Sequence, residues 1–277
     1  MTFTNWLAVI LFSGIFIGSF MYGEQSALYI NGLGLIIVLS GTLGAIFLSY
    51  SSENIRASLK VARNSYRKNP ANAKEIVDTL IFLSVQSRQK GVLALENVED
   101  ETTISFLKRA LGMLVDRYNM NELRDILYTE MYYFKQRRNQ HERLYHHAAR
   151  LAPAFGVAGS VIGLIAMLSG IGDPDVILHT IPVALTSTLY GIVLANFIFT
   201  PIAENIKTRT CEELMLQKLI TDGVIAILQE QNPVRLVTKL ESFLTPSARD
   251  KEQQSFEELR EKVYQMKYAD DAEFAKD

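Results

Sequence analysis

Four stretches of the chain contain no Asp, Glu, Lys or Arg, and each is long enough to cross a lipid bilayer. They run over residues 1–23, 25–52, 151–172 and 176–203. A helix of about 20 apolar residues spans the hydrocarbon core of a membrane. Because lipid offers the backbone no hydrogen-bond partners, such stretches must be helical. The pattern therefore predicts an all-α polytopic membrane protein, with transmembrane helices at about 5–22, 30–50, 150–171 and 179–201.

The distribution of positive charge predicts the orientation of these spans. All 28 Lys and Arg residues lie outside the four stretches, 17 of them between residues 53 and 150 and 11 after residue 203. The short connections carry only Glu24, Asp173 and Asp175. Since Lys and Arg near the ends of spans remain in the cytoplasm, both connections are expected outside and both termini inside. A cleaved signal peptide is a weaker alternative for the first stretch, because no Lys or Arg precedes its apolar residues.

The remaining segments have the pattern of helices with one buried face. Leu80, Leu83, Leu123 and Leu127 belong to apolar runs with spacings of three and four residues. We divide the chain into a first transmembrane hairpin (1–52), a helical cytoplasmic domain (53–147), a second hairpin (148–203) and a helical cytoplasmic tail (204–277). Residues 70–72 are expected to open a helix after a break. Within the tail, a helix through residue 227 and a short helix to residue 243 are expected.

The predicted spans lack the ionisable groups that ion translocation normally uses. No span contains a carboxylate, Lys or Arg, and the nearest histidine, His179, lies at the outer end of the fourth. Either the protein moves no ions, or a partner supplies the carboxylate. The sequence shows no phosphate-binding loop, nucleophile motif or metal-ligand cluster. We therefore expect neither an enzyme nor a cofactor or metal site, and a net charge of −2 gives no indication of nucleic acid binding.

Histidine and cysteine add little to this picture. His141, His146 and His147 precede the third span without carboxylates in a metal-binding arrangement, so we interpret them as interfacial. Cys211 is the single cysteine, which excludes an internal disulfide.

Small residues in the third span allow a close helix contact. Gly156, Gly159 and Gly163 follow one another at spacings of three and four residues. They suit the approach of another backbone, either within the subunit or from a partner. Pro153 lies near the inner end of this span, where it either interrupts the helix or begins it.

Hydroxyl side chains gather in the fourth span as Thr186, Ser187 and Thr188. In most transmembrane helices such hydroxyls bond back to carbonyl groups of their own helix. Together with Ser160 of the third span, they could instead line a polar path or coordinate a cation.

Residues 88–101 bring a basic cluster next to an acidic cluster. One interpretation is a solvated helix face with local ion pairs, and the functional interpretation is a charged contact surface. Exposed ion pairs contribute only about 0.2–1 kcal/mol each, which suits brief, repeated contact better than tight binding.

Several motifs together resemble the flagellar motor stator family that includes MotA and PomA, within the wider MotA/TolQ/ExbB superfamily. The resemblance covers roughly residues 5–250 and rests on four spans, a large loop between the second and third, and seven sequence pieces. These pieces are residues 39–45 (LSGTLGA), 88–96 (RQKGVLALE), 122–127 (ELRDIL), 152–156 (APAFG), 188–191 with 194–196 (TLYG, LAN), 201–203 (PIA), and 232–233 with 239–240 and 243–244 (NP, KL, FL).

The resemblance implies a function and a set of partners. Proteins of this family assemble as a homopentamer around two copies of a single-span protein, MotB or PomB, which carries a membrane aspartate and binds peptidoglycan. Flow of H⁺ or Na⁺ past that aspartate turns the pentamer in the bacterial inner membrane. The cytoplasmic loops then push the rotor protein FliG, which drives flagellar rotation and chemotaxis.

The same resemblance implies roles for individual residues. The rotor contact would include Arg88, Glu96, Lys90 and Glu99. The ion path would include Ser160 and Thr188, while Thr186 and Ser187 are candidates only from the hydroxyl cluster described above. The residues that couple the ion step to loop movement would be Pro153 and Pro201.

Three alternatives stay open at this point. A TolQ- or ExbB-like energiser would have three spans, so the first hairpin argues against it, whereas a non-flagellar MotA-like motor would share the whole membrane part. A passive membrane scaffold would move no ions. Ser160 stands where many relatives have Thr. A hydroxyl at both Ser160 and Thr188 favours sodium coupling, but some proton-driven members share this pattern, so both ions stay open.

Overall fold

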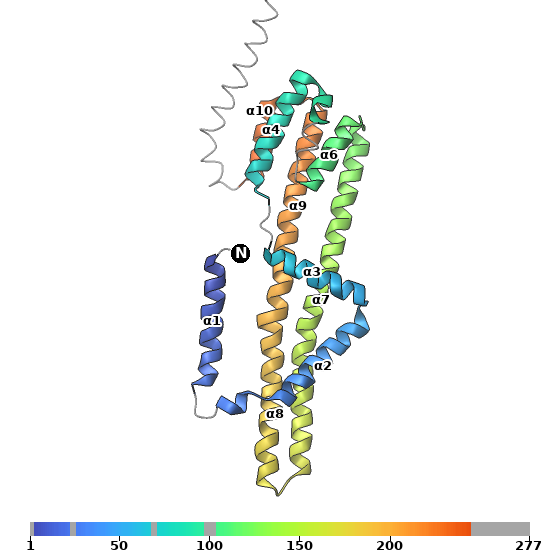
Figure 1. The fold of residues 1–277 in the computed structure, drawn as a ribbon. Coiled ribbons are helices and arrows are strands. Elements are labelled where there is room, and N and C mark those ends of the chain that lie inside the picture. The colour runs from blue at the N-terminus through green and yellow to red at the C-terminus, as the bar shows by residue number, and fades with distance from the viewer. Residues whose placement is uncertain (1–2, 23–25, 68–70, 97–103, 245–277) are drawn as a thin grey trace, which may run out of the picture. The chain divides into compact units, whose positions relative to one another are not determined.

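The structure is a computed structural model that describes residues 3–22, 26–67, 71–96 and 104–244 of the 277-residue chain. Every regular element in these ranges is helical and none is a strand (Figure 1), which confirms the all-α prediction. The elements are α1 (Phe3–Met21), η1 (Ser26–Tyr29), α2 (Gly32–Ser49), α3 (Ser52–Arg67), α4 (Ala73–Lys90), η2 (Val92–Leu95), α6 (Ser105–Val115), α7 (Met120–Ser169), α8 (Pro174–Val193), the π-helix η3 (Leu194–Phe199), α9 (Thr200–Leu228) and α10 (Pro233–Glu241).

The chain forms two compact units, each built from two separate segments. The first comprises residues 1–69 and 136–210, and the second residues 70–135 and 211–277. We call them the membrane unit and the head unit. Helices α7 and α9 each contribute residues to both.

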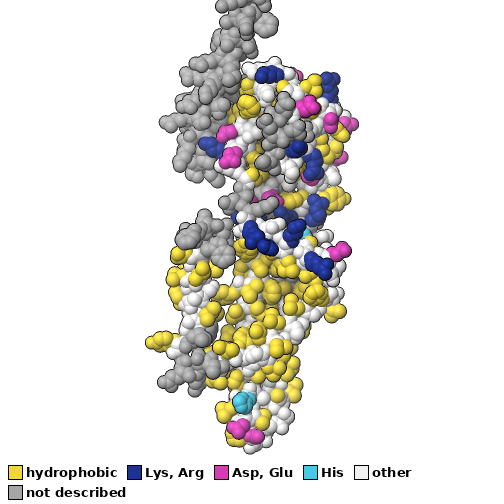
Figure 2. Space-filling model, viewed as in Figure 1, with side chains coloured by type: hydrophobic (Ala, Val, Ile, Leu, Met, Phe, Trp, Pro, Cys, Tyr) yellow, Lys and Arg dark blue, Asp and Glu magenta, His cyan; other side chains and the backbone are white. Residues whose placement is uncertain are grey.

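The membrane unit contains the apolar surfaces expected of a membrane protein. In the described residues, three helical runs are long and apolar enough to span a bilayer: Gly32–Ser49, one within Met120–Ser169 and one within Pro174–Leu228. The apolar part of the first helix, Leu7–Ser19, is shorter. Large hydrophobic side chains such as Ile36, Ile165 and Leu185 are 60–70% exposed, and Figure 2 shows a nearly continuous hydrophobic surface there. Such a patch on a helical bundle is typical of lipid or protein contact.

Helices α7 and α8 approach each other at three glycines of α7. A Cβ on Gly156 would lie 2.9 Å from the backbone oxygen of Ser187, and one on Gly163 would lie 2.8 Å from the backbone nitrogen of Ala184. A Cβ on Gly159 would lie 2.7 Å from the Ser187 side chain. The glycines therefore serve helix packing within the subunit, which was one of the two interpretations of their spacing.

The start of α2 is fastened to α8 by side-chain hydrogen bonds. Asn31 caps α2 by accepting a hydrogen bond from the Gly34 amide at 3.0 Å. The Tyr190 hydroxyl of α8 accepts from the Asn31 amide at 2.7 Å and donates to the Tyr29 carbonyl at 2.5 Å. Gly34 packs against Ser187, because a Cβ on Gly34 would lie 2.8 Å from the Ser187 hydroxyl oxygen. These contacts fix α2 beside the second half of α8.

Pro153 lies inside α7, a single helix of 50 residues. Of the two interpretations of this proline, the helix start is therefore wrong. A proline inside a helix removes one N–H···O=C bond, yet the helix continues on both sides. After α7 ends at Ser169, Gly172 adopts a φ of +111°, and Asp173 caps α8 by accepting from the Asp175 amide at 3.0 Å.

The head unit has its own hydrophobic core, built from α4, α6, α10 and the parts of α7 and α9 that belong to this unit. Leu80, Leu83, Leu123 and Leu127 are fully buried in it. Asn72 caps α4 by accepting from the Lys74 amide at 3.1 Å, which confirms the helix start expected at residues 70–72. The two tail helices also confirm the sequence prediction, since α9 ends at residue 228 and α10 covers residues 233–241.

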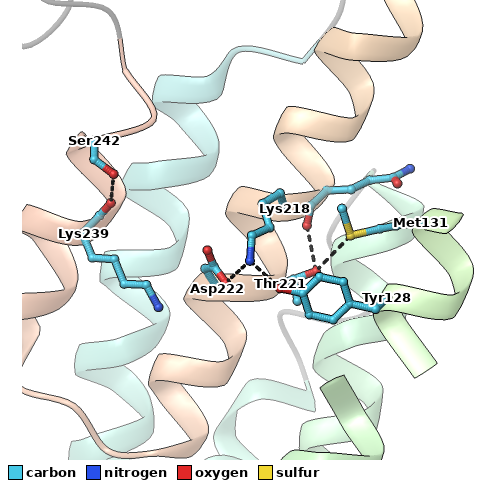
Figure 3. Close-up of polar contacts among 8 residues, drawn as sticks. Tyr128, Met131, Lys218, Thr221, Asp222, Lys239 and Ser242 are labelled. Carbon is cyan, nitrogen blue, oxygen red and sulfur yellow. Dashed lines mark hydrogen bonds and ion pairs between the residues drawn. The ribbon is translucent and has the colours of Figure 1, made fainter. Parts of the chain in front are cut away.

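A lysine joins α7 to α9 within the head unit (Figure 3). Lys218 donates to the Tyr128 hydroxyl at 2.5 Å and to the Asp222 carboxylate at 2.8 Å, and its Nζ lies 4.9 Å from the centroid of the Tyr128 ring. Burial acts to lower the pKa of Lys218, but its hydrogen bonds to Asp222 and Tyr128, together with the charges of these two groups, outweigh burial and raise the pKa above its usual value. Lys218 is therefore a charged link between two helices.

We predict that Gly191→Ala destabilises the membrane unit. The new Cβ would lie 2.5 Å from the backbone oxygen of Ala152 and 3.0 Å from the Cα of Pro153. Backbone atoms cannot move aside as a flexible side chain can, so we expect a loss of about 1–3 kcal/mol. The control is Gly44→Ala in α2, where nothing lies within 4 Å of the added Cβ. Thermal unfolding of the purified protein in detergent measures both, and equal midpoints would contradict the close contact.

We also predict that Lys218→Met weakens the head unit, because it leaves the mostly buried Asp222 carboxylate without its cation. The expected loss is about 1–2 kcal/mol, after a discount for the partial exposure of Lys218. Adding Asp222→Asn should recover part of it. The matched control is Lys207→Met, which breaks an exposed pair with Glu204 at 3.7 Å on the same helix.

The contribution of Lys218 should also depend on pH. Because its folded pKa is raised, the stabilisation is complete below pH 10.5 and is lost as pH rises through the folded pKa. Unfolding measured between pH 7 and pH 9 should therefore show a constant difference between the wild-type protein and the Lys218→Met variant, and a difference that grows in this range would contradict it.

Candidate functional site

Ser160 of α7 and Thr188 of α8 face each other inside the membrane unit. Their hydroxyl oxygens are 2.5 Å apart. The Gly156 carbonyl oxygen lies 3.3 Å from the Ser160 hydroxyl and 3.4 Å from the Thr188 hydroxyl, and the Ala184 carbonyl accepts from Ser160. Both side chains are half-buried. We call this group of two hydroxyl and two carbonyl oxygens the oxygen cluster.

The chemistry of the oxygen cluster is limited and specific. Its four atoms carry partial negative charge but no formal charge, and each hydroxyl can donate only one hydrogen bond at a time. Oxygen atoms of this kind replace part of the hydration shell of a small hard cation, as exposed carbonyls do in transporters. A cation here would still need a negative group nearby, because the predicted spans contain none.

Thr186 and Ser187 differ from this pair. The Thr186 hydroxyl donates to the Pro182 carbonyl and the Ser187 hydroxyl to the Val183 carbonyl, each at 2.6 Å. They are 4% and 0% exposed. The structure therefore confirms the interpretation that hydroxyls bond back to their own helix for these two, and it does not bring them into the oxygen cluster.

Pro201 follows a stretch of helix that sequence reasoning did not anticipate. Residues Leu194–Phe199 form a π-helix, and the Thr200 amide bonds to the Ala195 carbonyl, five residues back. Proline has no N–H to continue the α-helical hydrogen-bond pattern, so a wide turn just before it limits the loss of backbone hydrogen bonds. The Pro201 carbonyl accepts a hydrogen bond from the Tyr66 hydroxyl of α3 at 3.3 Å. This bond connects a predicted coupling residue to α3.

Three histidines lie where the membrane unit leaves the apolar region. His141 contacts the Ser58 hydroxyl of α3 at 2.8 Å. Burial, and then the charge of Arg138, lower the pKa of His141, so it is neutral at pH 7. His146 lies 3.6 Å from Glu142 and 3.9 Å from Glu204, and the His147 ring packs edge-on against Tyr50. Each histidine thus contacts a residue of another segment of the membrane unit, while their interfacial role stays a prediction.

The predicted rotor residues that the structure describes belong to the head unit. Arg88, Lys90 and Glu96 are all exposed, at and just after the end of α4. The Arg88 guanidinium donates to the Glu230 carbonyl beyond the end of α9, a contact across 142 positions that the sequence did not indicate. Glu99 lies outside the described residues.

A cavity of about 370 Å³ lies beside these residues. Lys90 and Arg117 supply positive charge to its lining, and Leu93, Leu114 and Leu228 supply apolar surface. Such a combination fits a partner surface that presents an acidic residue next to an apolar one. The edge of the head unit thus offers both charge and a recess.

Comparison with known proteins identifies relatives of the chain. The model of the MotA/TolQ/ExbB proton channel family matches residues 98–218. The chain is 32% identical to Motility protein A of Borreliella burgdorferi over 231 residues, which cover 79% of this chain and 87% of that protein. It is 28% identical to Chemotaxis protein PomA of Vibrio alginolyticus, over 82% of this chain and 89% of that protein.

A solved structure has the same fold. In the flagellar MotAB stator complex from Bacillus subtilis, the matching chain aligns with a TM-score of 0.81 at 28% identity, covering 88% of this chain and 97% of that chain. The fold and the family model thus place the chain in a class of helical membrane proteins that includes proton channels. The chain belongs to the MotA/PomA family of flagellar motor stator proteins.

Proposed function

We propose that this chain is the stator subunit of a bacterial flagellar motor, which converts ion flow into torque on the rotor. The observation that carries the proposal is the oxygen cluster of Ser160 and Thr188 in a membrane unit whose predicted spans hold no ionisable group. The oxygen cluster can replace part of a cation's hydration shell, but it cannot hold the cation without a carboxylate nearby. The carboxylate is supplied by a MotB- or PomB-type single-span partner.

The topology follows from charge and from the membrane unit. We propose four spans, with α1 as the first, because α1 is a helix of 19 residues that contains no Asp, Glu, Lys or Arg. Both termini and all Lys and Arg then lie in the cytoplasm. No enzymatic reaction and no cofactor belong to the proposal, and the transported ion is H⁺ or Na⁺.

The assembly is a homopentamer around two copies of the partner. Exposed apolar side chains on α7 and α8 support a contact between subunits. Val161 and Leu185, for example, are 49% and 70% exposed in the single chain. Ser160 and Thr188, half-buried in the subunit, would then face the partner's carboxylate.

Pro153 and Pro201 would transmit the ion step. Pro153 lies against Gly191, two residues from the end of α8, and Pro201 follows the π-helix and bonds to α3. A movement at the oxygen cluster would therefore reach two places where backbone hydrogen bonding is already interrupted.

The energy of one ion step is sufficient for a rotor contact. One charge crossing about 100 mV releases about 2.3 kcal/mol. That is several times the roughly 0.2–1 kcal/mol of a single exposed ion pair. Contacts between FliG and residues such as Arg88 and Glu96 could be broken and remade at each step.

A non-flagellar motor of the same superfamily is the second candidate. The MotA/TolQ/ExbB family model covers such proteins as well. Deleting the gene separates the two: loss of swimming with a normal cell envelope supports the flagellar function, and normal swimming overturns it.

We predict that removing the hydroxyls of the oxygen cluster slows the motor. Ser160→Ala and Thr188→Val should each reduce rotation speed about ten-fold, and the double variant should be little worse, because both changes break the same contact. Thr188→Ser keeps the hydroxyl and is the control. Bead rotation measures speed, and membrane levels of the protein confirm assembly. Normal speed in the double variant would remove the oxygen cluster from the ion path.

We predict that reversing the charge of the rotor-facing residues stops swimming without loss of membrane assembly. Glu96→Lys is the cleaner variant, because within the described part of the chain Glu96 bonds only through its backbone amide, to the Leu93 carbonyl, and not through its carboxylate. Arg88→Glu also breaks the bond to the Glu230 carbonyl, so its thermal stability must be measured beside its motility. The control is Arg235→Glu in α10, which makes the same change of charge as Arg88→Glu at another exposed site of the head unit. Normal swimming of both rotor variants would contradict the contact.

A further inference from the structure

Helix α3 leaves the membrane span directly and has two different faces. It begins at Ser52, three residues after α2 ends at Ser49. One face carries small residues, with Ser58, Ala62 and Ser65 all buried. Ala62 packs into a cluster with α7 and α9 residues, including Leu144 and Ile206. This packed face fixes which side of α3 points away from the bundle.

The opposite face of α3 carries four basic residues in one line. Their spacing of four, three and four positions keeps them on one side of a helix. All four are exposed, and within the described residues none forms an ion pair. The only acidic residue of α3 is Glu53, in its first turn. We call this line the basic stripe; it consists of Arg56, Lys60, Arg63 and Arg67.

Exposed apolar side chains adjoin the basic stripe both at the end of α2 and on α3 itself. Phe47 and Leu48, in the last turn of α2, are 59% and 92% exposed. Leu59, next to the stripe on α3 itself, is 59% exposed. Figure 2 shows Lys and Arg side chains gathered at one end of the hydrophobic surface. A helix with this pattern lies in a membrane interface, with apolar side chains among the acyl chains and basic ones at the headgroups.

We propose that the basic stripe binds the phosphate groups of anionic phospholipids in the cytoplasmic leaflet. Three of its four members are Arg, whose guanidinium matches phosphate with two parallel hydrogen bonds. The stripe is about 16 Å long, from the 1.5 Å rise per residue over eleven positions. That length spans several headgroups and exceeds a single compact anion. Its position immediately after a membrane span favours lipid over an acidic protein partner.

Lipid bound to the stripe would act on the coupling region through α3. The Tyr66 hydroxyl donates to the Pro201 carbonyl at 3.3 Å, and Arg209 of α9 donates to the Ser65 carbonyl at 3.2 Å. Holding the outer face of α3 at the headgroups thus holds its inner face against the start of α9. The lipid site is separate from the oxygen cluster and from the head unit.

The test uses a tryptophan beside the stripe and brominated lipids that quench it. The full-length chain carries a single Trp, so Leu59→Trp in a Trp6→Phe background gives one reporter. The protein is reconstituted in vesicles that contain brominated phosphatidylglycerol or brominated phosphatidylcholine. Quenching gives the relative binding constant of the two lipids at this position. We expect at least a five-fold preference for the anionic lipid, the factor that one basic residue near a surface supplies.

Changing Arg56, Lys60, Arg63 and Arg67 to Gln should reduce the preference to about one. High salt should lower it as well, since the contacts are at the membrane surface. The reporter control is Leu43→Trp on α2, an exposed side chain within the span, which should show no preference. The charge control changes Arg117, Arg124, Arg235 and Lys239 of the head unit to Gln, which should leave the preference at residue 59 intact.

Equal binding of the two lipids at residue 59 would overturn the proposal, and so would a preference that survives the loss of all four charges. In the first case the stripe would be left for solvent or for an acidic protein surface. The readout is lipid binding alone, so its failure is distinct from a failure of the stator function, which is read from swimming and rotation.

Discussion

The contact between the backbones of α7 and α8 is the constraint on which the membrane unit depends. Lipid gives two apolar helices no hydrophobic reason to associate, so close packing must supply the attraction. Gly156, Gly159 and Gly163 on one side and Gly191 on the other remove the side chains that would hold the helices apart. The same closeness brings Ser160 and Thr188 to 2.5 Å and gathers two carbonyl oxygens around them. Helix packing and the oxygen cluster thus come from one arrangement of residues.

Predicted spans that carry polar but uncharged groups leave the ionisable group of the proposed ion site to a partner. A buried carboxylate is costly in each subunit that carries one, and a ring of subunits would multiply that cost. Hydroxyl and carbonyl groups cost little, because they find partners within their own helices. In the proposed assembly, leaving the single ionisable group to a central partner would let every subunit present the same neutral surface to it in turn. Rotation past that carboxylate would be easier because no subunit holds a competing charge.

The sequence predicted the parts of the structure that depend on composition and local signals. Charge-free stretches located the apolar helices, and Asn72 marked the start of α4. What it did not predict depends on neighbours distant in the chain. Thr186, Ser187 and Thr188 are consecutive, yet Thr188 alone meets Ser160, because the rotation of α8 about its axis is set by α2 and α7. The bond from Arg88 to the Glu230 carbonyl joins two segments with no shared motif. Pro153 lies inside one long helix because the cost of one missing hydrogen bond is small beside the packing on both sides.

The wide turn before Pro201 also changes the phase of the helix. A π-turn holds more residues than an α-turn, and each additional residue rotates the side chains that follow by roughly 100°. The face of α8 that carries Thr188 and the face of α9 that packs Ala203 and Ile206 against α3 are therefore not continuous on one ideal helix. An α-helical wheel drawn through residues 174–228 would place one of the two faces on the wrong side. This one turn lets a single run of chain contribute Thr188 to the oxygen cluster at one end and the α3 contact at the other, each in its own orientation.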